Sequence, residues 1–173
     1  MARLVALLRG INLGSKRRVA MADLRALLEE ELGYTDVRTV LASGNVVFTG
    51  PKTKAREKLE QALKQRFEMD IDVVVRTMGE LHAVIDADPF KDEVENPTRY
   101  FVAFLDTEPQ AERLAQLAEE DFAPDKFEAH DREVYAWCPD GMQDSRLMKA
   151  LGKPGLAGTA TVRNWATVNK LLE

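Results

Sequence analysis

The sequence predicts an α+β fold of two ferredoxin-like (split βαβ) halves, each an antiparallel sheet with its helices packed on one face. Short apolar runs stopped by Gly or Pro alternate with stretches whose apolar residues recur at helical spacing. The first 76 residues predict the element order β-α-β-β-α-β, which is the ferredoxin-like order. The second half predicts β-α-β-β-α again, followed by a final helix. The repeat lies in this element order rather than in matching residues.

In the first half, the run "RLVALLRG" predicts a buried strand that ends at glycine. A helix is expected over 21–32, with Gly33 as its C-cap. The stretch "VRTVLASGNVVFTG" predicts two strands joined by a two-residue turn at Gly44-Asn45. A second helix and the strand "IDVVVR" follow. The buried face of the second helix is predicted to consist of Ala55, Leu59, Ala62, Leu63 and Phe67.

After the strand "IDVVVR", Thr77 is predicted to cap a third helix that buries Met78, Leu81 and Ile85 and completes the first half. The acidic loop "DADPFKDEVENP" then divides the chain into lobes 1–85 and 86–173, although one compact unit remains an alternative. After the strand "TRYFVAFL", we expect a helix capped by Thr107 with Pro109 in its first turn. A hairpin is expected around His130-Asp131, and a short helix over 144–151. The last helix is predicted to be capped by Thr161 and to bury Trp165, Val168 and Leu172.

The composition is that of a globular protein with an uneven charge. The net charge is −5, but residues 1–85 carry 14 Lys and Arg against 11 Asp and Glu, while residues 86–173 carry 10 against 18. The acidic balance disfavours nucleic-acid binding, which depends on phosphate contacts. No apolar run approaches the ~20 residues that span a bilayer, and the N-terminal apolar run is too short for a signal peptide, so no membrane partner is expected. A single cysteine is in keeping with a cytoplasmic location.

Strand topology predicts one candidate binding site. The loop after the first strand and the turn between the second and third strands should meet at one end of the sheet, because the first and third strands pair in this fold. That edge would gather a guanidinium, carboxamides, a hydroxyl, flexible glycine backbone and the basic run before the first helix, which together suit an anion. The predicted ligand-binding residues here are Arg9, Gly10, Asn12, Lys16, Arg17, Arg18, Ser43, Gly44 and Asn45.

Other groups of residues give weaker indications of a functional site. Arg163 and Asn164, placed in the first turn of the last helix, are read either as cap residues or as part of the site. The two histidines lack a second ligand at metal spacing, and the acidic loop lacks calcium-loop spacing, so no metal is predicted. "GKPGLAG" is not a P-loop and "GINLG" is not a dinucleotide fingerprint, so no cofactor is predicted.

Three stretches form an ordered set of motifs from the first strand to the last helix: "LLRGINLG", "DLRALLEEELGYTDVRTVLASGNVVF" and "RNWATVNKL". This set resembles a known bacterial family, that of domain of unknown function 1697 (DUF1697). The family typically has paired glycines after its RGIN motif, and here Ser15 replaces the second of them. The resemblance implies an α+β structure with ferredoxin-like halves, and no biochemical activity is established for the family. The motif positions that it implies are Arg9, Gly10, Asn12, Ser43, Gly44, Asn45, Arg163, Asn164 and Trp165.

Three functional hypotheses follow. The first is a protein that binds a small phosphate- or carboxylate-bearing ligand, with Asn12 and Asn45 orienting it. The second is a phosphate-ester or acyl-phosphate hydrolase, by analogy with acylphosphatases, in which Asn45 positions water and Arg9, Arg17 or Arg18 holds the phosphate. The third is an RNA- or protein-binding module, which the scarcity of aromatic residues on the central strands disfavours. Whether the protein is an enzyme, and its oligomeric state, are left open.

Overall fold

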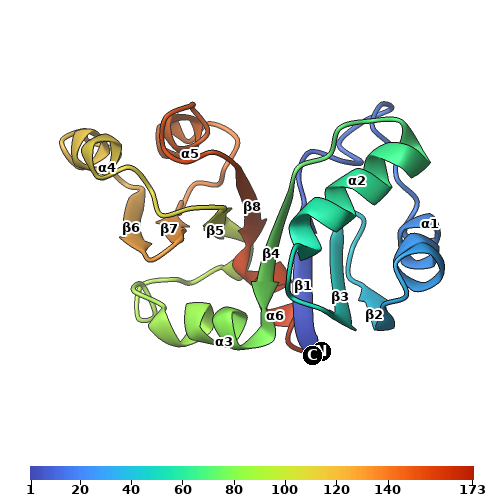
Figure 1. Cartoon of the computed structure of the whole chain (residues 1–173). Coiled ribbons are helices and arrows are strands. Elements are labelled where there is room, and N and C mark those ends of the chain that lie inside the picture. Colours follow the sequence, from blue (N-terminus) through green and yellow to red (C-terminus); the bar gives the residue numbers. More distant parts are fainter. The chain divides into compact units, whose positions relative to one another are not determined.

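The computed structural model describes residues 1–173, which form two compact units (Figure 1). The first unit comprises Met1–Ala83 together with Lys170–Glu173, and the second comprises Val84–Asn169. The last four residues thus belong to the first unit, where Arg38 donates a hydrogen bond from Nη2 to the carbonyl of Leu171 at 3.0 Å. The division into lobes 1–85 and 86–173 stays a prediction.

The first unit is a four-stranded antiparallel sheet in the order β2-β3-β1-β4. This order is the ferredoxin-like arrangement that the sequence predicts. The π-helical segment η1 continues α1, so the helix predicted over 21–32 is present with a wider last turn. The elements are β1 (Ala2–Leu8), α1 (Met21–Ala26), η1 (Leu27–Glu31), β2 (Thr35–Thr39), β3 (Asn45–Gly50), α2 (Ala55–Phe67) and β4 (Val73–Thr77).

The second unit repeats this plan with its strands in the order β6-β7-β5-β8, all antiparallel. Helix α3 (Met78–Ala87) lies between the two sheets in the sequence, and Thr77 caps it by accepting a hydrogen bond from the N–H of Glu80 at 3.1 Å, as predicted. The other elements are η2 (Pro97–Arg99), β5 (Tyr100–Leu105), α4 (Ala111–Ala118), β6 (Lys126–His130), β7 (Glu133–Trp137), α5 (Arg146–Leu151), β8 (Ala160–Asn164) and α6 (Trp165–Lys170).

The two units match in detail as well as in element order. The residue that ends the central strand donates to the following hairpin turn in both, from Leu8 to Gly44 at 2.8 Å and from Leu105 to Arg132 at 2.9 Å. A buried arginine also lies at the same register position in each, Arg76 opposite Val5 in the first unit and Arg163 opposite Val102 in the second. The repeat expected from the element order therefore extends to individual backbone contacts.

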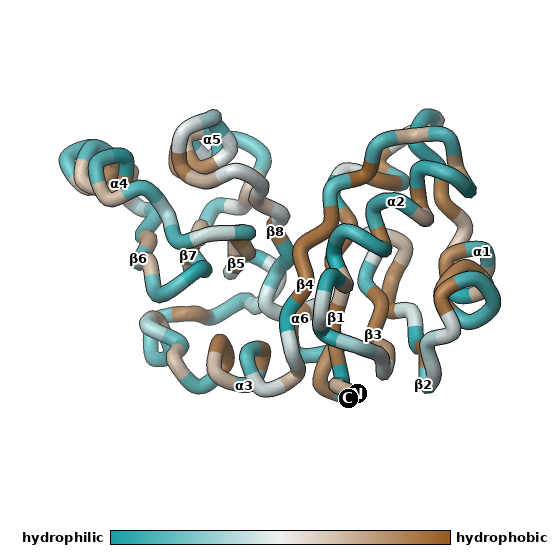
Figure 2. The backbone as a smooth tube through the Cα atoms, viewed as in Figure 1, coloured by the Kyte–Doolittle hydropathy of each residue, from teal (hydrophilic) through white to brown (hydrophobic).

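Each sheet buries alternate residues against its helices. In the first unit Leu4, Ala6 and Leu8 of β1 pack in one cluster with Leu24 of α1 and Leu59 of α2. The aromatic rings of Tyr34 and Phe48 stack in the same cluster with centroids 4.7 Å apart. In the second unit, alternate residues of β5 pack with apolar residues of α4 and α5. Figure 2 shows β1 and β4 among the hydrophobic segments, in keeping with central or well-covered strands.

Three local predictions were wrong. Gly44-Asn45 is not a two-residue turn, because residues 40–44 connect the strands and Asn45 begins β3. Helix α4 starts at Ala111 rather than at Thr107, so Pro109 precedes the helix. Thr161 does not cap the last helix but lies in β8, a strand absent from the prediction. That strand alternates buried Thr161 and Arg163 with less buried neighbours, and a buried arginine hides the pattern from a hydropathy argument.

Gly44→Ala is expected to destabilise the first unit. A Cβ at this position would lie 2.7 Å from Cδ1 of Ile11 and 3.0 Å from Cβ of Leu8, and φ is +95°. Overpacking costs about 1–3 kcal/mol and the left-handed conformation about 1–2 kcal/mol, so we expect the free energy of unfolding in urea to fall by about 2–5 kcal/mol. Gly14→Ala is the control, because a Cβ added there would have no atom within 4 Å. Equal effects of the two changes would contradict this account.

Candidate functional site

The loop after β1 and the connection from β2 to β3 lie against each other, as the topology predicts. Leu8 donates its backbone N–H to the carbonyl of Gly44 at 2.8 Å, and Asn12 donates from Nδ2 to the carbonyl of Ala42 at 2.7 Å. Gly44 also packs closely on the side chain of Ile11. The structure therefore brings together the two segments that carry most of the predicted site residues.

Asn12 holds the loop in shape. Its Nδ2 donates to the carbonyls of Val19 and Ala42 at 2.8 and 2.7 Å, and its Oδ1 accepts from the N–H of Val19 at 2.8 Å. Its backbone has φ of +57°, a conformation that Asn tolerates better than most residues. The carboxamide, expected to orient a ligand, instead ties the two ends of the loop to each other and to the neighbouring turn.

Arg17 and Arg18 also bond to the protein's own backbone. Arg17 donates from Nε to the carbonyl of Gly10 and from Nη2 to the carbonyl of Asp70, both at 2.9 Å. Arg18 donates from Nη1 to the carbonyl of Gly14 at 3.3 Å, a longer and weaker contact. The guanidinium of Arg17 thus joins the start of the loop to the segment before β4, and two of its three nitrogens donate inside the protein.

The turn residues are held in the same way. The side chain of Asn45 is fully buried and donates from Nδ2 to the carbonyl of Val40 at 2.7 Å and to Oγ of Ser43 at 2.9 Å. Both amide hydrogens are therefore used inside the protein. Asn45 fixes the turn. Because its side chain is buried, it cannot orient a ligand or a water molecule as expected.

Two basic side chains of the predicted site have no polar contact inside the protein. Arg9 and Lys16 are exposed, and neither side chain makes a hydrogen bond or ion pair within the protein. The backbone N–H of Arg9 is held by the carbonyl of Asp72 at 2.9 Å, which places this residue at the end of β1. Two acids lie beside this edge: Asp70 is paired with Lys64 at 3.3 Å, whereas Asp72 is exposed. The edge therefore has two available cations and one acid that opposes them.

Arg163 and Asn164 lie at the end of β8 and not in the last helix. Arg163 is 8% exposed and donates from Nη1 to Oγ1 of Thr161 at 2.8 Å and to the carbonyl of Val162 at 2.9 Å. Burial lowers the pKa of its guanidinium to about 10, which still leaves it charged at neutral pH. Asn164 accepts from the N–H of Thr167 at 2.9 Å and so caps α6, which supports the cap interpretation of this motif.

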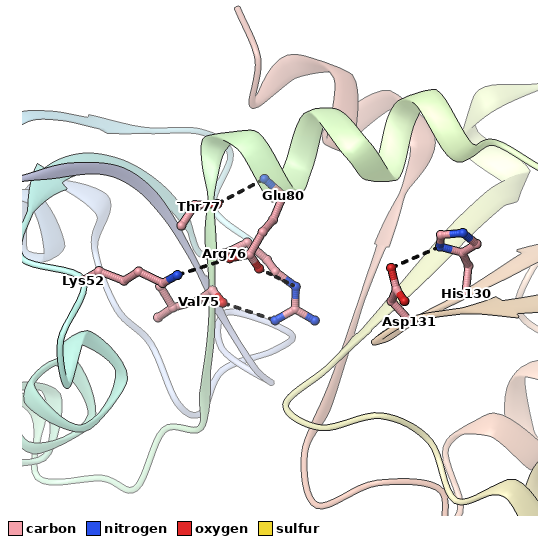
Figure 3. A network of polar contacts seen from close by, with 7 residues as sticks. All are labelled: Lys52, Val75, Arg76, Thr77, Glu80, His130 and Asp131. Carbon is pink, nitrogen blue, oxygen red and sulfur yellow. Dashed lines mark hydrogen bonds and ion pairs between the residues drawn. The ribbon is translucent and has the colours of Figure 1, made fainter.

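Arg76 is a buried cation that the sequence reasoning missed. It is 2% exposed, its Nε lies 4.0 Å from Oε2 of Glu80, and Lys52 approaches the other carboxylate oxygen at 3.9 Å (Figure 3). The T-x-x-E spacing of Thr77 and Glu80 is typical of a capping box, and it could have indicated the position of Glu80 from the sequence.

Figure 3 also shows a second, exposed pair, that of His130 and Asp131, whose Nδ1 and Oδ2 atoms are 3.5 Å apart.

Neither a metal centre nor an activated thiol emerges from the side-chain geometry. No group of three or more His, Cys, Asp and Glu side chains is arranged to hold a metal ion. Cys138 is buried, and its Sγ lies 3.7 Å from Oγ of Ser145, which in turn donates to Asp125 at 2.7 Å and caps α5. Burial raises the pKa of the Cys138 thiol to about 11, so the thiol is protonated at neutral pH.

Removing the side chain of Asn12 is expected to loosen the loop. Asn12→Gly keeps the positive φ accessible but deletes three hydrogen bonds, so we expect a loss of about 1–3 kcal/mol and faster hydrogen exchange at the amide of Val19. Lys16→Ala is the control, since its side chain makes no internal contact of this kind. Unchanged exchange at Val19 in Asn12→Gly would contradict the role given to Asn12.

Cys138 is expected to resist thiol reagents in the folded protein. Because the thiol is buried and its pKa is raised, reaction with 5,5′-dithiobis-(2-nitrobenzoate) at pH 8 should proceed only through unfolding or local opening. The same chain in concentrated urea should react rapidly. Equal rates in the two conditions would show that the thiol is accessible.

Among the comparisons with known proteins, one shows the family of this chain and another shows its fold. The family model described as "Protein of unknown function (DUF1697)" matches residues 1–135. A solved structure, that of the conserved bacterial protein SP0830 from Streptococcus pneumoniae, is similar to this chain with a TM-score of 0.78 and 24% identity over 98% of this chain and 96% of that one. No curated protein matches. None of the helices combines the length and hydropathy needed to cross a membrane. The match over residues 1–135 includes the first two of the three sequence motifs, and it shows that the chain belongs to the DUF1697 family.

Proposed function

We propose that this protein binds a small phosphate- or carboxylate-bearing ligand at the edge formed by the loop after β1 and the connection from β2 to β3. One observation supports the proposal most directly. The side chains of Arg9 and Lys16 make no hydrogen bond or ion pair inside the protein, yet they belong to a loop whose shape is fixed by hydrogen bonds. A fastened loop loses little conformational freedom when a ligand binds, which favours affinity.

The residues of this edge divide into two roles. Arg9 and Lys16 would contact the anion, and the longer contact of Arg18 to Gly14 would be exchanged for it at small cost. Asn12, Arg17 and Asn45 would act through the shape that they give to the loop and the turn. Ser43 and the glycines contribute a short turn with little side-chain bulk.

The affinity expected from such an edge is modest. Hydrogen bonds to charged groups contribute about 1.5–3 kcal/mol each, so two of them correspond to dissociation constants near the millimolar range. Because the cations are exposed, binding should weaken with added salt. The opposing carboxylate of Asp72 should weaken it further.

The hydrolase hypothesis receives less support. It required Asn45 to position water, and the amide hydrogens of this buried side chain are both donated inside the protein. A water-positioning group of that kind is therefore lacking from the place where the acylphosphatase analogy put it. The RNA-binding hypothesis would require exposed aromatic residues on which bases can stack. The exposed large apolar residues at this edge are leucines instead.

Phosphate titration followed by ¹⁵N–¹H spectra tests the anion site. Inorganic phosphate should shift the amide signals of Gly10 and Gly14, and Arg9→Ala with Lys16→Ala should weaken binding at least tenfold. Asp72→Asn should strengthen binding about twofold at low salt, because it removes an opposing charge.

The matched control is Lys91→Ala with Lys149→Ala, which removes the same charge from exposed positions of the second unit. It should leave phosphate binding close to that of the parent. If both double variants weaken binding equally, the effect is one of net charge and the proposed site is wrong. Absence of any phosphate-dependent shift in the loop would also overturn the proposal.

A further inference from the structure

Two leucines stand exposed on the segments that form the proposed anion site. Leu13 is 85% exposed on the loop after β1, and Leu41 is 49% exposed on the connection from β2 to β3. The hydrogen bond from Asn12 to the carbonyl of Ala42 joins the residues directly next to them. Besides these two, the large hydrophobic side chains that are exposed are Met1 and Met142. Half of this small set therefore lies at one edge.

The backbone presents these side chains to solvent instead of folding them into the core. Leu41 has φ of +60°, an uncommon conformation for a bulky residue, and the neighbouring Asn12 and Arg17 also have positive φ. Space around the loop is open, because nothing lies within 4 Å of a Cβ built on Gly10 or Gly14. The connection from β2 to β3 therefore has a strained backbone at Leu41 and also exposes its apolar side chain to water. A polar residue such as Asn at this position would lower the cost of both.

Charge and apolar surface together define the chemistry of a ligand. An inorganic anion would use Arg9 and Lys16 but leave both leucines in water. We infer that the ligand is a soluble organic phosphate or carboxylate with an apolar chain, whose charged head meets these cations and whose chain covers Leu13 and Leu41. This inference rests on the proposed anion site and names the class of ligand that fits it.

The expected signature is a dependence of affinity on chain length. A methylene that is fully buried strengthens binding about fourfold, and one that contacts protein on one side only should give about half of that free energy, or about twofold. A series of methyl, butyl and hexyl phosphate keeps the charged head constant, so the slope of affinity against chain length isolates the apolar contact.

The test compares that slope in the parent and in a variant with Leu13→Ser and Leu41→Asn. Asn is chosen at position 41 because it accepts a positive φ, and Leu13→Ser alone serves if the double variant folds poorly. We expect about a twofold gain per methylene in the parent, a nearly flat series in the variant, and the same inorganic phosphate affinity in both. Met142→Ser, which removes an exposed hydrophobic residue of the second unit, should keep the parent's slope.

The failures of the two proposals are distinguishable. A flat series in a parent that still binds inorganic phosphate overturns this inference and leaves the anion site standing. A steep series that persists in the leucine variant places the chain elsewhere and also overturns the inference. No binding of any phosphate overturns the proposed function together with it.

The same head-and-chain chemistry occurs in lipids, so a further measurement separates the two sources. The protein should not sediment with vesicles of phosphatidylcholine and phosphatidylglycerol. Sedimentation that the leucine variant abolishes, combined with a flat series for the soluble phosphates, would show that the partner is a lipid surface and overturn the soluble ligand.

Discussion

The central position of β1 is the constraint on which the first unit depends. This strand pairs along one edge with β3 and along the other with β4, so its backbone groups are satisfied by two neighbours. Consecutive residues Leu4 and Val5 point to opposite faces and are both fully buried. A slip of one residue would exchange these faces and move the polar end of the strand into the core, so the register is strongly specified. In the second unit β5 lies between β7 and β8 in the same way, and all six of its residues are buried.

The place of the candidate site follows from that pairing. Because β1 and β3 are antiparallel neighbours, the end of β1 meets the start of β3, and the loop and the turn must share one edge of the sheet. Polar side chains then satisfy the irregular backbone between them. Asn12, Arg17 and Asn45 take that role, which leaves Arg9 and Lys16 for contacts outside the protein. Motif residues in such a loop can therefore serve its geometry more than its chemistry.

The two units carry opposite charges at equivalent positions, directly after their central strands. Arg9 and Asp106 follow the central strands of their sheets, and each donates its backbone N–H to the segment before the last strand, to Asp72 at 2.9 Å and to Thr159 at 3.0 Å. In the second unit the acid also accepts from the N–H of Thr159 at 2.9 Å and lies against Gly158. The carboxylate there closes its own loop, whereas the guanidinium of Arg9 extends into solvent. The same scaffold position thus serves internal structure in one unit and is available for an external anion in the other.

Four features could be predicted from the sequence: the element order, the ferredoxin-like class, the buried face of α2 and the meeting of the loop with the turn. Apolar periodicity and glycine positions act over short stretches of chain, and the pairing of β1 with β3 then follows from the element order. Which polar side chains remain without an internal partner could not be predicted, since it depends on hydrogen bonds such as that from Arg17 to Asp70, which join residues far apart in the sequence. The tertiary structure also decided the strand β8, because its alternation depends on the burial of Arg163, a residue whose hydropathy indicates solvent. Burial of a charged side chain is set by its surroundings and is not encoded in its immediate neighbours.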